Sequence, residues 1–320
     1  MGKKHLYNCL RIKNAELVAV SDTSKTALSL ARNIGVNKVY RDYHLLLESP
    51  EIDAVVITLP TFLHYECVKR AATERKDIFL EKPLATKVAE GEEMVAYAKR
   101  NDIKMMVGYH LRFVTAFQKL KNDVESGSIG DVQMALATFV GPGPFHHRRR
   151  KDEPAPVPDW YFDNKLASGA LLDTGSHVVN LLRWYFGDVA DAKSYVGHRF
   201  HMDFEDYVAS ILKFKNGTIS MVNVGWFSED IQIKIDLYGT VAHRCASYAR
   251  REGIKFVKDA IMRKIHRKPM LPIAYEPYFD ELQYFVDCVS TNTQPHPSGE
   301  EALEDLKTIS LMYKSRFQFS

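Results

Sequence analysis

The first third of the chain alternates short apolar runs with segments whose apolar residues recur at helical spacing. The apolar runs lie at 16–21, 53–59, 77–80 and 104–108, and the helical patterns at 25–34, 64–75 and 88–101. Runs that are apolar throughout are typical of parallel strands covered on both faces. The pattern therefore predicts a doubly wound, Rossmann-like α/β domain over residues 1–108.

A different pattern follows. An extended run at 131–140 leads into a polar, proline-rich loop that continues to residue 158, and a helical pattern covers 169–186. Polar and apolar residues then alternate at 207–214 and 218–226 on either side of Asn216-Gly217, a strong hairpin signal, and again at 231–238. Helical patterns at 279–290 and 300–317 close the chain. We expect residues 109–320 to form an α+β domain with a largely antiparallel sheet, whose open apolar face is covered by helices or by another subunit.

Composition narrows the class of protein. Hydrophobic residues make up 46% of the chain and charged residues 26%, which is ordinary for a globular protein and excludes a disordered or fibrous one. The formal net charge of +3 gives no reason to expect nucleic-acid binding. No apolar run approaches the roughly 20 residues of a membrane span, and the N-terminus lacks a signal-peptide core. The scattered cysteines form no metal-ligand spacing, so we expect no metal site and a reducing, cytoplasmic location.

Two acidic positions follow predicted strands of the first domain. Glu81-Lys82-Pro83 comes directly after the run 77–80, at the strand end where open α/β sheets bind ligands. A lysine there can hold a substrate hydroxyl or relay its proton; a solvated Glu-Lys pair that opens a helix is the alternative. Asp22 ends the run 16–21, where an acid can accept hydrogen bonds from an adenosine ribose or cap the following helix.

Asp173 and His177 lie four residues apart within the apolar helical segment 169–186. This spacing places both side chains on one face of a helix. Polar groups in such a segment are costly unless they have partners, and histidine is the natural acid or base near neutral pH. The pair is thus a candidate catalytic pair, with a structural His–Asp pair as the alternative.

Basic residues gather in two further places. The run 146–151 contains two histidines and four permanent cations, and arginines such as Arg148 and Arg149 can grip phosphate or carboxylate groups through paired hydrogen bonds. This favours an anionic substrate, with a solvated basic loop as the alternative. Residues 248–268 combine helix-spaced apolar positions with many basic ones. We expect a core-packed stripe with a solvated face there, and binding to an anionic membrane surface is the alternative.

Taken together and in order, these segments resemble the Gfo/Idh/MocA family of NAD(P)-dependent sugar and inositol oxidoreductases. The resemblance covers nearly the whole chain. It rests on Asp22, on the motif from Thr58 to His64, on Glu81-Lys82-Pro83, and on residues 108–113, 169–177, 238–240, 281–286 and 295–298. The most specific part of the resemblance is the tripeptide Glu81-Lys82-Pro83, followed far downstream by the D-x-x-x-H motif of Asp173 and His177.

The resemblance implies hydride transfer between a nicotinamide cofactor and a hydroxyl or carbonyl carbon of a sugar, cyclic polyol or sugar derivative. It implies that Lys82 contacts the nicotinamide ribose and the reacting hydroxyl, that His177 is the general base, and that Asp173 orients the substrate or His177. The cofactor-binding residues would be Gly2, Asp22, Thr58, Pro60, His64, Glu81 and Lys82. The substrate-binding residues would be Tyr109, His110 and Arg112, joined by Arg148 and Arg149 of the basic loop.

The resemblance also bears on the cofactor and the assembly. Asp22 favours NAD, because a carboxylate repels the 2′-phosphate of NADP, and Lys25 keeps NADP open as an alternative. A homodimer or homotetramer is expected. Another reaction, such as hydride transfer to an imine or enone, or a redox-neutral reaction with retained cofactor, is an alternative within the family.

The chain departs from the family pattern at three places, one of which is Ser168-Gly169-Ala170, where the family often has a richer glycine run. The family begins with a strand and G-x-G-x-x-G, whereas this sequence opens Met1-Gly2-Lys3-Lys4-His5 and carries only the last glycine and the histidine that often follows it. Either Met1 is an internal methionine of a longer protein, or the chain is a short paralogue with impaired cofactor binding. A cofactor-poor binding or regulatory homologue is therefore the alternative to the enzyme. His110 stands where inositol and glucose members usually have asparagine.

Overall fold

The computed structural model describes residues 1–144, 148–149, 153–154, 160, 163, 166, 168–200, 203–248 and 276–318. The chain divides into two compact units. The first comprises Met1–Ala85, Ala89–His110 and the described residues 276–301, and the second comprises Thr86–Val88, the described residues from Leu111 to 248, and those from Ala302 onward. The predicted boundary after residue 108 does not anticipate that 276–301 cluster with the first unit.

Short parallel strands form the sheets of the first unit: β1 (Ala19–Ser21), β2 (Lys38–Tyr40), β3 (Ala54–Ile57), β4 (Asp77–Glu81) and β5 (Met105–Gly108). They pair as β1-β2 and as β3-β4-β5. In the order 3-2-1-4-5-6 of a doubly wound sheet, β2 and β1 take positions 3 and 2, and β3, β4 and β5 take positions 4, 5 and 6. Position 1 falls at the break between the two sheets. The Rossmann-like parallel sheet is confirmed, although β2 was not predicted.

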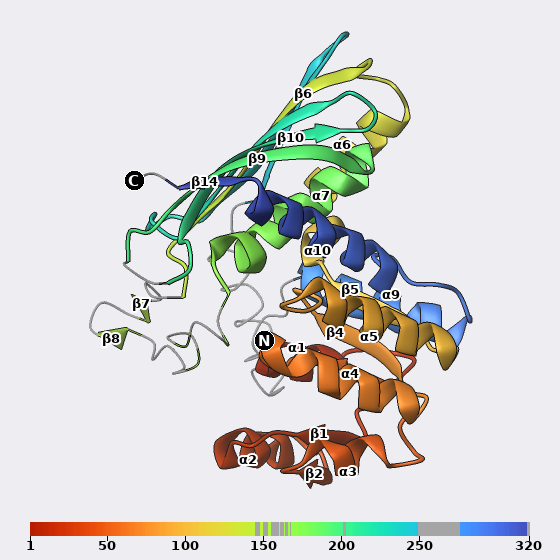
Figure 1. Cartoon of the computed structure of the whole chain (residues 1–320). Coiled ribbons are helices and arrows are strands. Elements are labelled where there is room, and N and C mark those ends of the chain that lie inside the picture. The colour runs from red at the N-terminus through yellow and green to blue at the C-terminus, as the bar shows by residue number, and fades with distance from the viewer. Residues whose placement is uncertain are drawn as a thin grey trace, which may run out of the picture. The chain divides into compact units, whose positions relative to one another are not determined.

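Helices flank these strands (Figure 1). They are α1 (Gly2–Cys9), α2 (Lys25–Asn33), α3 (Tyr43–Leu47), η1 (Thr61–Leu63), α4 (His64–Thr73), α5 (Val88–Arg100) and α9 (Glu276–Ser290). The α4 helix packs on β3 and β4, whereas α9 packs on β4 and β5 and against α1. The N-terminal and C-terminal parts of the chain therefore meet in this unit.

The second unit is built on a seven-stranded mixed sheet of order β13-β12-β6-β11-β10-β9-β14. The strands are β6 (Val132–Val140), β9 (Val189–Gly197), β10 (Tyr207–Phe214), β11 (Ile219–Gly225), β12 (Gln232–Gly239), β13 (His243–Tyr248) and β14 (Arg316–Gln318). Neighbours pair antiparallel except for β6 with β11 and β9 with β14, so the largely antiparallel sheet is confirmed. Gly217, with φ of 96°, makes the predicted turn between β10 and β11.

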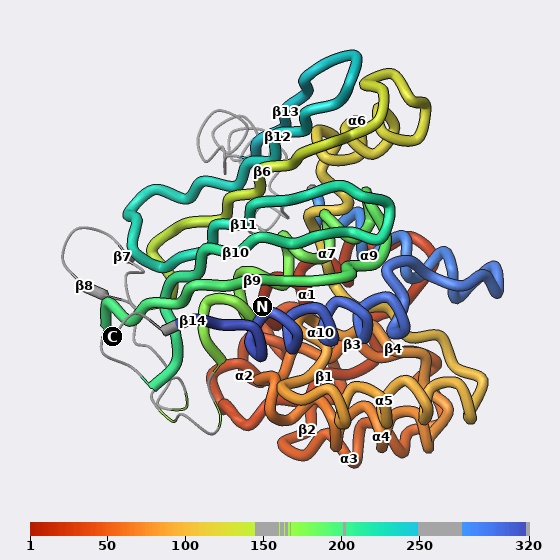
Figure 2. The backbone as a smooth tube through the Cα atoms, turned by 45° about the horizontal axis from the view of Figure 1, so that its top comes forward, coloured from red at the N-terminus to blue at the C-terminus, as the bar shows by residue number. Residues whose placement is uncertain are grey.

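The helical segments of this unit are η2 (His110–Phe113), α6 (Thr115–Glu125), η4 (Leu171–Gly175), α7 (Ser176–Phe186) and α10 (Gly299–Lys314). Alternate residues of β10 are buried and exposed, and α7 lies along the buried face of the sheet (Figures 1 and 2). The predicted helix over 300–317 is too long, because the chain after Lys314 pairs with the edge of β9 and Phe317 stacks on Tyr195. None of the helices in the described ranges is both long and apolar enough to cross a membrane.

A buried network joins α10 to α7. The Asp305 carboxylate accepts hydrogen bonds from Asn180 at 2.6 Å and from Arg183 at 2.7 Å, and Arg112 Nε donates to Asn180 Oδ1 at 2.8 Å. Asp305 is fully buried. Since each buried polar group has a partner, the network fixes the direction of α7 against α10.

We expect Asp305→Ala to lower the free energy of unfolding by about 3–5 kcal/mol, because it leaves the Arg183 guanidinium and the Asn180 amide without their acceptor. The control is Glu304→Ala, which removes an exposed pair with Lys307 and should cost less than about 1 kcal/mol. Urea unfolding measures both. Equal losses in the two variants would contradict the importance of the network.

Candidate functional site

His64 connects the two loops that carry the predicted cofactor residues. Its Nε2 lies 2.9 Å from the Leu59 carbonyl, and its Nδ1 lies 3.0 Å from the Pro83 carbonyl and 3.2 Å from that of Leu84. Burial lowers the pKa of His64, which keeps the imidazole neutral at neutral pH. A neutral imidazole carries one N–H, so it donates a hydrogen bond to only one of these loops and packs against the other, at the strand ends of β3 and β4 where Thr58, Pro60 and Lys82 lie.

Gly2 lies against Thr58 at the start of α1. A Cβ atom on Gly2 would come within 3.0 Å of Thr58 Oγ1, which is tighter than ordinary contact. A glycine therefore allows the first turn of α1 to approach the end of β3 closely. The backbone N–H groups of such a turn are suited to anionic groups.

Asp22 lies at the end of β1 and is exposed. Its Oδ1 accepts a hydrogen bond from the Ser24 N–H at 2.7 Å, and Ser24 caps α2. Asp22 thus shapes the turn into α2, but the capping alternative is wrong in its residue, because the N-cap of α2 is Ser24. Because the Asp22 carboxylate is exposed, it is accessible to a ribose hydroxyl, and that contact stays a prediction.

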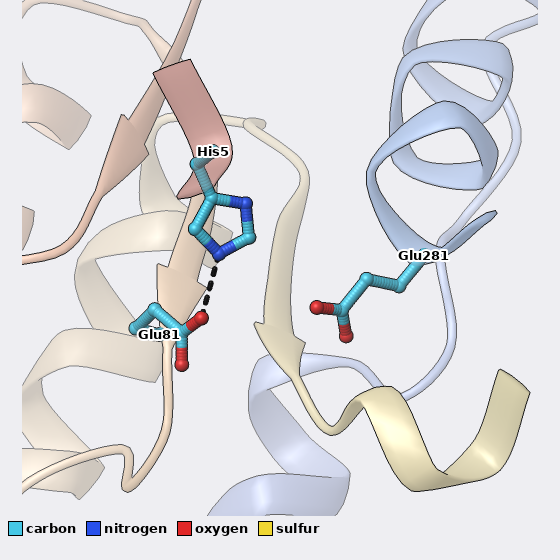
Figure 3. A group of neighbouring side chains, drawn as sticks. All are labelled: His5, Glu81 and Glu281. Carbon is cyan, nitrogen blue, oxygen red and sulfur yellow. Dashed lines mark hydrogen bonds and ion pairs between the residues drawn. The ribbon is translucent and has the colours of Figure 1, made fainter. Parts of the chain in front are cut away.

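A buried cluster of His5, Glu81 and Glu281 lies beside the Lys82 loop (Figure 3). His5 Nε2 and Glu81 Oε1 are 2.6 Å apart, and the Glu281 side chain points toward this pair from α9. One nitrogen or oxygen atom from each of the three residues lies within 4.8 Å of the others. Among the residues that the structure describes, none forms a hydrogen bond with either carboxylate oxygen of Glu281.

The charges of this cluster follow from its surroundings. Burial alone would raise the pKa of Glu81, but the hydrogen bond and charge of His5 outweigh it and lower that pKa, so Glu81 is an anion. Burial, followed by the Glu81 charge, raises the pKa of Glu281 well above its ordinary value. These effects favour the protonated, uncharged form of Glu281.

Proton sharing describes the cluster better than a metal ion does. Ligands of a tetrahedral zinc ion at about 2.0–2.1 Å lie roughly 3.3 Å apart, whereas the His5 and Glu81 atoms are 2.6 Å apart, a hydrogen-bond distance. The positive charges of Lys82 and Lys4 also act on these carboxyls. The charge of Glu81 is thus balanced by His5 and Lys82, and the raised pKa of Glu281 favours its protonated form.

His110 and Tyr109 are both buried. The His110 ring stacks on Tyr278 with centroids 4.0 Å apart, and the Lys4 ammonium lies 3.9 Å from the centre of the same tyrosine ring. Burial lowers the pKa of His110 to about 3, so its ring is neutral. His110 can offer a substrate a hydrogen bond but no charge.

Asp173 and His177 lie on consecutive segments of the second unit. Asp173 is in η4, which is a π-helical turn, and His177 is in the first turn of α7. The predicted regular helix over 169–186 is therefore corrected at its start. The π turn changes the angular relation of the two side chains from that of an α-helix, and such turns occur often at functional sites. His177 is buried and its ring centroid lies 5.9 Å from that of Phe139.

The predicted arginines fall into two groups. Arg112 is buried in the network with Asn180 and lies over the Trp184 ring at 5.3 Å. Arg148 and Arg149 form the short strand β7 (Arg148–Arg149), which pairs with β8 (Glu153–Pro154). Their side chains, the rest of the basic run 146–151 and nearly all of 248–268 lie outside the described residues.

The family of the chain is decided by two adjoining matches. A model described as "Oxidoreductase family, NAD-binding Rossmann fold" matches residues 1–109, and one for the GFO/IDH/MocA C-terminal domain matches residues 117–243. The chain belongs to the Gfo/Idh/MocA family. The expected resemblance, fold and NAD-dependent oxidoreductase class are thereby confirmed.

Similar proteins agree with this family. Myo-inositol 2-dehydrogenase of Thermotoga maritima is 28% identical over 310 residues, which cover 94% of this chain and 89% of that protein. The scyllo-inositol 2-dehydrogenase (NAD(+)) of Bacillus subtilis is 26% identical, with 96% of this chain and 88% of that protein covered. A solved structure of a probable dehydrogenase from Thermotoga maritima has a TM-score of 0.82 at 25% identity and covers 98% of this chain and 93% of its own.

Sequence reasoning missed the role of Glu281 in this Gfo/Idh/MocA protein. Residue 281 was part of the resemblance, but the pattern of an amphipathic helix does not show that one of its glutamates is buried and has a raised pKa. Its partner Glu81 comes from β4, far away in the sequence. Only the fold brings the two carboxyls together.

Glu281 should make stability depend on pH. Because its folded pKa is raised, the stabilising proton is fully present below the ordinary glutamate pKa of about 4.3 and is lost as the pH rises through the folded value. We expect Glu281→Gln, which is neutral at every pH, to gain stability relative to wild type as the pH rises, by up to about 1.4 kcal/mol per pH unit. Urea unfolding between acidic and basic pH measures this. Glu300→Gln, at an exposed position, is the control, and an unchanged pH slope in Glu281→Gln would refute the neutral acid.

Proposed function

We propose that this protein transfers a hydride between NAD and the CH–OH carbon of a sugar, cyclic polyol or sugar derivative. The observation that carries the proposal is the match along nearly the whole chain to proteins named as inositol dehydrogenases. The fold agrees with that of a scyllo-inositol dehydrogenase from Lactobacillus casei solved with NAD(H) and scyllo-inositol, with a TM-score of 0.80. The alternative, a cofactor-poor regulatory homologue, predicts no hydride transfer.

The residues of the first unit fit a dinucleotide. The close approach of Gly2 to Thr58 supports a backbone cradle for phosphate groups, and exposed Asp22 supports a hydrogen bond to a ribose hydroxyl. Thr58, Pro60 and Glu81 would line the cofactor, with His64 holding their loops. When bound, the nicotinamide accepts the hydride; the carboxylate of Asp22 favours NAD over NADP.

The proton chemistry is assigned to Lys82, Asp173 and His177. As the hydride leaves the substrate carbon, the imidazole of His177 takes the proton of the hydroxyl and becomes an imidazolium, and the C–O bond becomes a carbonyl. The Lys82 ammonium donates to the same oxygen and stabilises the negative charge that develops on it. Asp173 orients His177 or the substrate.

Substrate recognition is proposed for Tyr109, His110, Arg112, Arg148 and Arg149. The neutral ring of His110 suits a sugar hydroxyl. Arg112, which is held by Asn180, supports an orienting role more than a freely moving anion clamp. The arginines of β7 would add affinity for a carboxylate or phosphate on the substrate.

We expect Lys82→Ala and His177→Ala to lower kcat by about 10²–10⁴-fold while the Kd for NAD changes little, because both groups act on the reacting hydroxyl. Steady-state kinetics with inositols and aldoses, paired with NAD titration by calorimetry, makes the comparison. Lys87→Ala, at an exposed position downstream of the same strand, is the control for Lys82. Wild-type turnover in His177→Ala would remove it as the base.

We also propose that the protein forms a homodimer or homotetramer through the exposed face of the seven-stranded sheet. Apolar side chains there form two adjacent rows across the strands: Ile211, Met221 and Leu136 in one, and Ile219, Met134 and Tyr238 in the next. Ile211 is 52% exposed and Ile219 44%. A continuous apolar patch of this kind is typical of an interface, and a flat sheet face can pair with a second copy of itself.

We expect the double variant Ile211→Asp/Met221→Lys to dissociate to monomers at micromolar concentration, because a partner surface would bury its charges. The control is Leu45→Asp on α3, which charges an equally exposed leucine (54% exposed) away from the sheet. Light scattering gives the masses. A monomeric wild-type protein would disprove this interface.

A reducing compartment, the cytoplasm, is proposed as the location. The support is that Cys9, Cys67, Cys245 and Cys288 are all free thiols. Such thiols persist where glutathione and thioredoxin keep cysteine reduced.

A further inference from the structure

Glu205 accepts hydrogen bonds from the segment that leads into the π turn of the second unit. Its Oε1 accepts hydrogen bonds from the Leu171 N–H at 3.0 Å and from the Tyr313 hydroxyl at 2.8 Å. Its backbone carbonyl accepts a further bond from the Ala170 N–H at 3.0 Å. Glu205 is only 4% exposed, so these partners replace water around the carboxylate.

Gly169 leaves the space in which the Glu205 carboxylate reaches the Leu171 N–H. A Cβ atom at residue 169 would lie 2.1–2.3 Å from the carboxylate atoms of Glu205. Any other residue would push the carboxylate away from the Leu171 N–H. The segment 169–171 and Glu205 are therefore fitted to each other.

The pKa values of Glu205 and Tyr313 keep the hydrogen bond between them in place. Burial raises the pKa of Glu205, while the Leu171 N–H and the Tyr313 hydroxyl oppose the rise, with His198 acting in the same direction as they do. Burial, followed by the charge and hydrogen bond of Glu205, raises the pKa of Tyr313 well above its ordinary value. Tyr313 thus remains a hydrogen-bond donor to Glu205 across the pH range of an enzyme assay.

The middle of the turn is held by a second contact. Trp226 Nε1 donates to Thr174 Oγ1 at 2.8 Å, and the Trp226 N–H donates to the Asp206 carbonyl at 2.8 Å. Residues 205 and 206 therefore connect to the turn both directly and through Trp226. The π turn is fixed from outside at its entry and at its middle.

This hold matters because a π turn is rare compared with an α-helix. If its wider turn relaxed to α-helical pitch, Asp173 would shift by about one residue, or roughly 100° around the axis, relative to His177. We propose that Glu205, together with Tyr313, is a positioning residue that holds 169–171 and thereby fixes the relative orientation of Asp173 and His177. The inference rests on the proposed function of these two residues.

The test compares Tyr313→Phe with Tyr185→Phe in the full chain. Each variant removes one tyrosine hydroxyl hydrogen bond of the same unit, since Tyr313 donates to Glu205 and Tyr185 donates to the Phe117 carbonyl at 3.0 Å, away from the turn. We expect Tyr313→Phe to lower kcat by about 10- to 100-fold with a smaller change in KM, as misplaced catalytic groups do. Tyr185→Phe should keep kcat at a comparable loss of thermal stability.

Variants of Glu205 separate positioning from folding. Glu205→Gln keeps an oxygen acceptor for the Leu171 N–H, so we expect it to retain more of kcat than Glu205→Ala does. The NMR titration of the His177 ring, assigned by comparison with His177→Asn, should shift in Glu205→Ala and Tyr313→Phe but not in Tyr185→Phe. This readout needs no turnover.

The outcomes distinguish the two proposals. Wild-type kcat and an unchanged His177 titration in folded Tyr313→Phe and Glu205→Ala would overturn the positioning role. Wild-type turnover in His177→Asn would instead overturn the proposed base. In that case a shifted His177 titration would still support Glu205 as the residue that holds the turn.

Discussion

A carboxyl group that is taken out of water must be paired or neutralised, and this constraint organises the protein. Four buried carboxyls meet it in different ways: Glu81 by His5, Glu281 by a proton, Glu205 by an N–H and a hydroxyl, and Asp305 by Arg183 and Asn180. An isolated buried charge costs several kcal/mol, so each pairing determines which distant segments can lie side by side. The functional residues lie on the segments that these pairings hold.

Each unit prepares its own part of the chemistry in this way. In the first unit, the neutral ring of His64 lies between the loops at the ends of β3 and β4, which present Thr58 and Lys82, and it donates to one of them, while anionic Glu81 pairs with His5. In the second, Glu205 and Asp305 hold the two ends of the segment that runs from the π turn through α7. The carboxyls thus act on the reaction through the backbone they position.

The parts of the fold that depend on neighbouring residues were predictable from the sequence. The continuous apolar run at 77–80 marks β4, and Asn216-Gly217 marks the hairpin of β10 and β11. The π turn, β14 and the return of α9 to the first unit depend on distant partners, so no local pattern shows them. For the same reason, the sequence indicated Lys82 and His177 through motifs but not Glu205 or Glu281, whose roles exist only in the folded chain.

Transfer of a labelled hydride tests the central claim most directly. The full chain is incubated with NAD and with inositols or aldoses that carry deuterium on the CH–OH carbons, and the nicotinamide is then analysed by mass spectrometry. The account predicts reduced nicotinamide that contains one deuterium, formed by the wild-type protein and strongly suppressed in His177→Ala. Bound NAD with no deuterium transfer from any polyol or sugar would contradict it and favour a non-catalytic homologue.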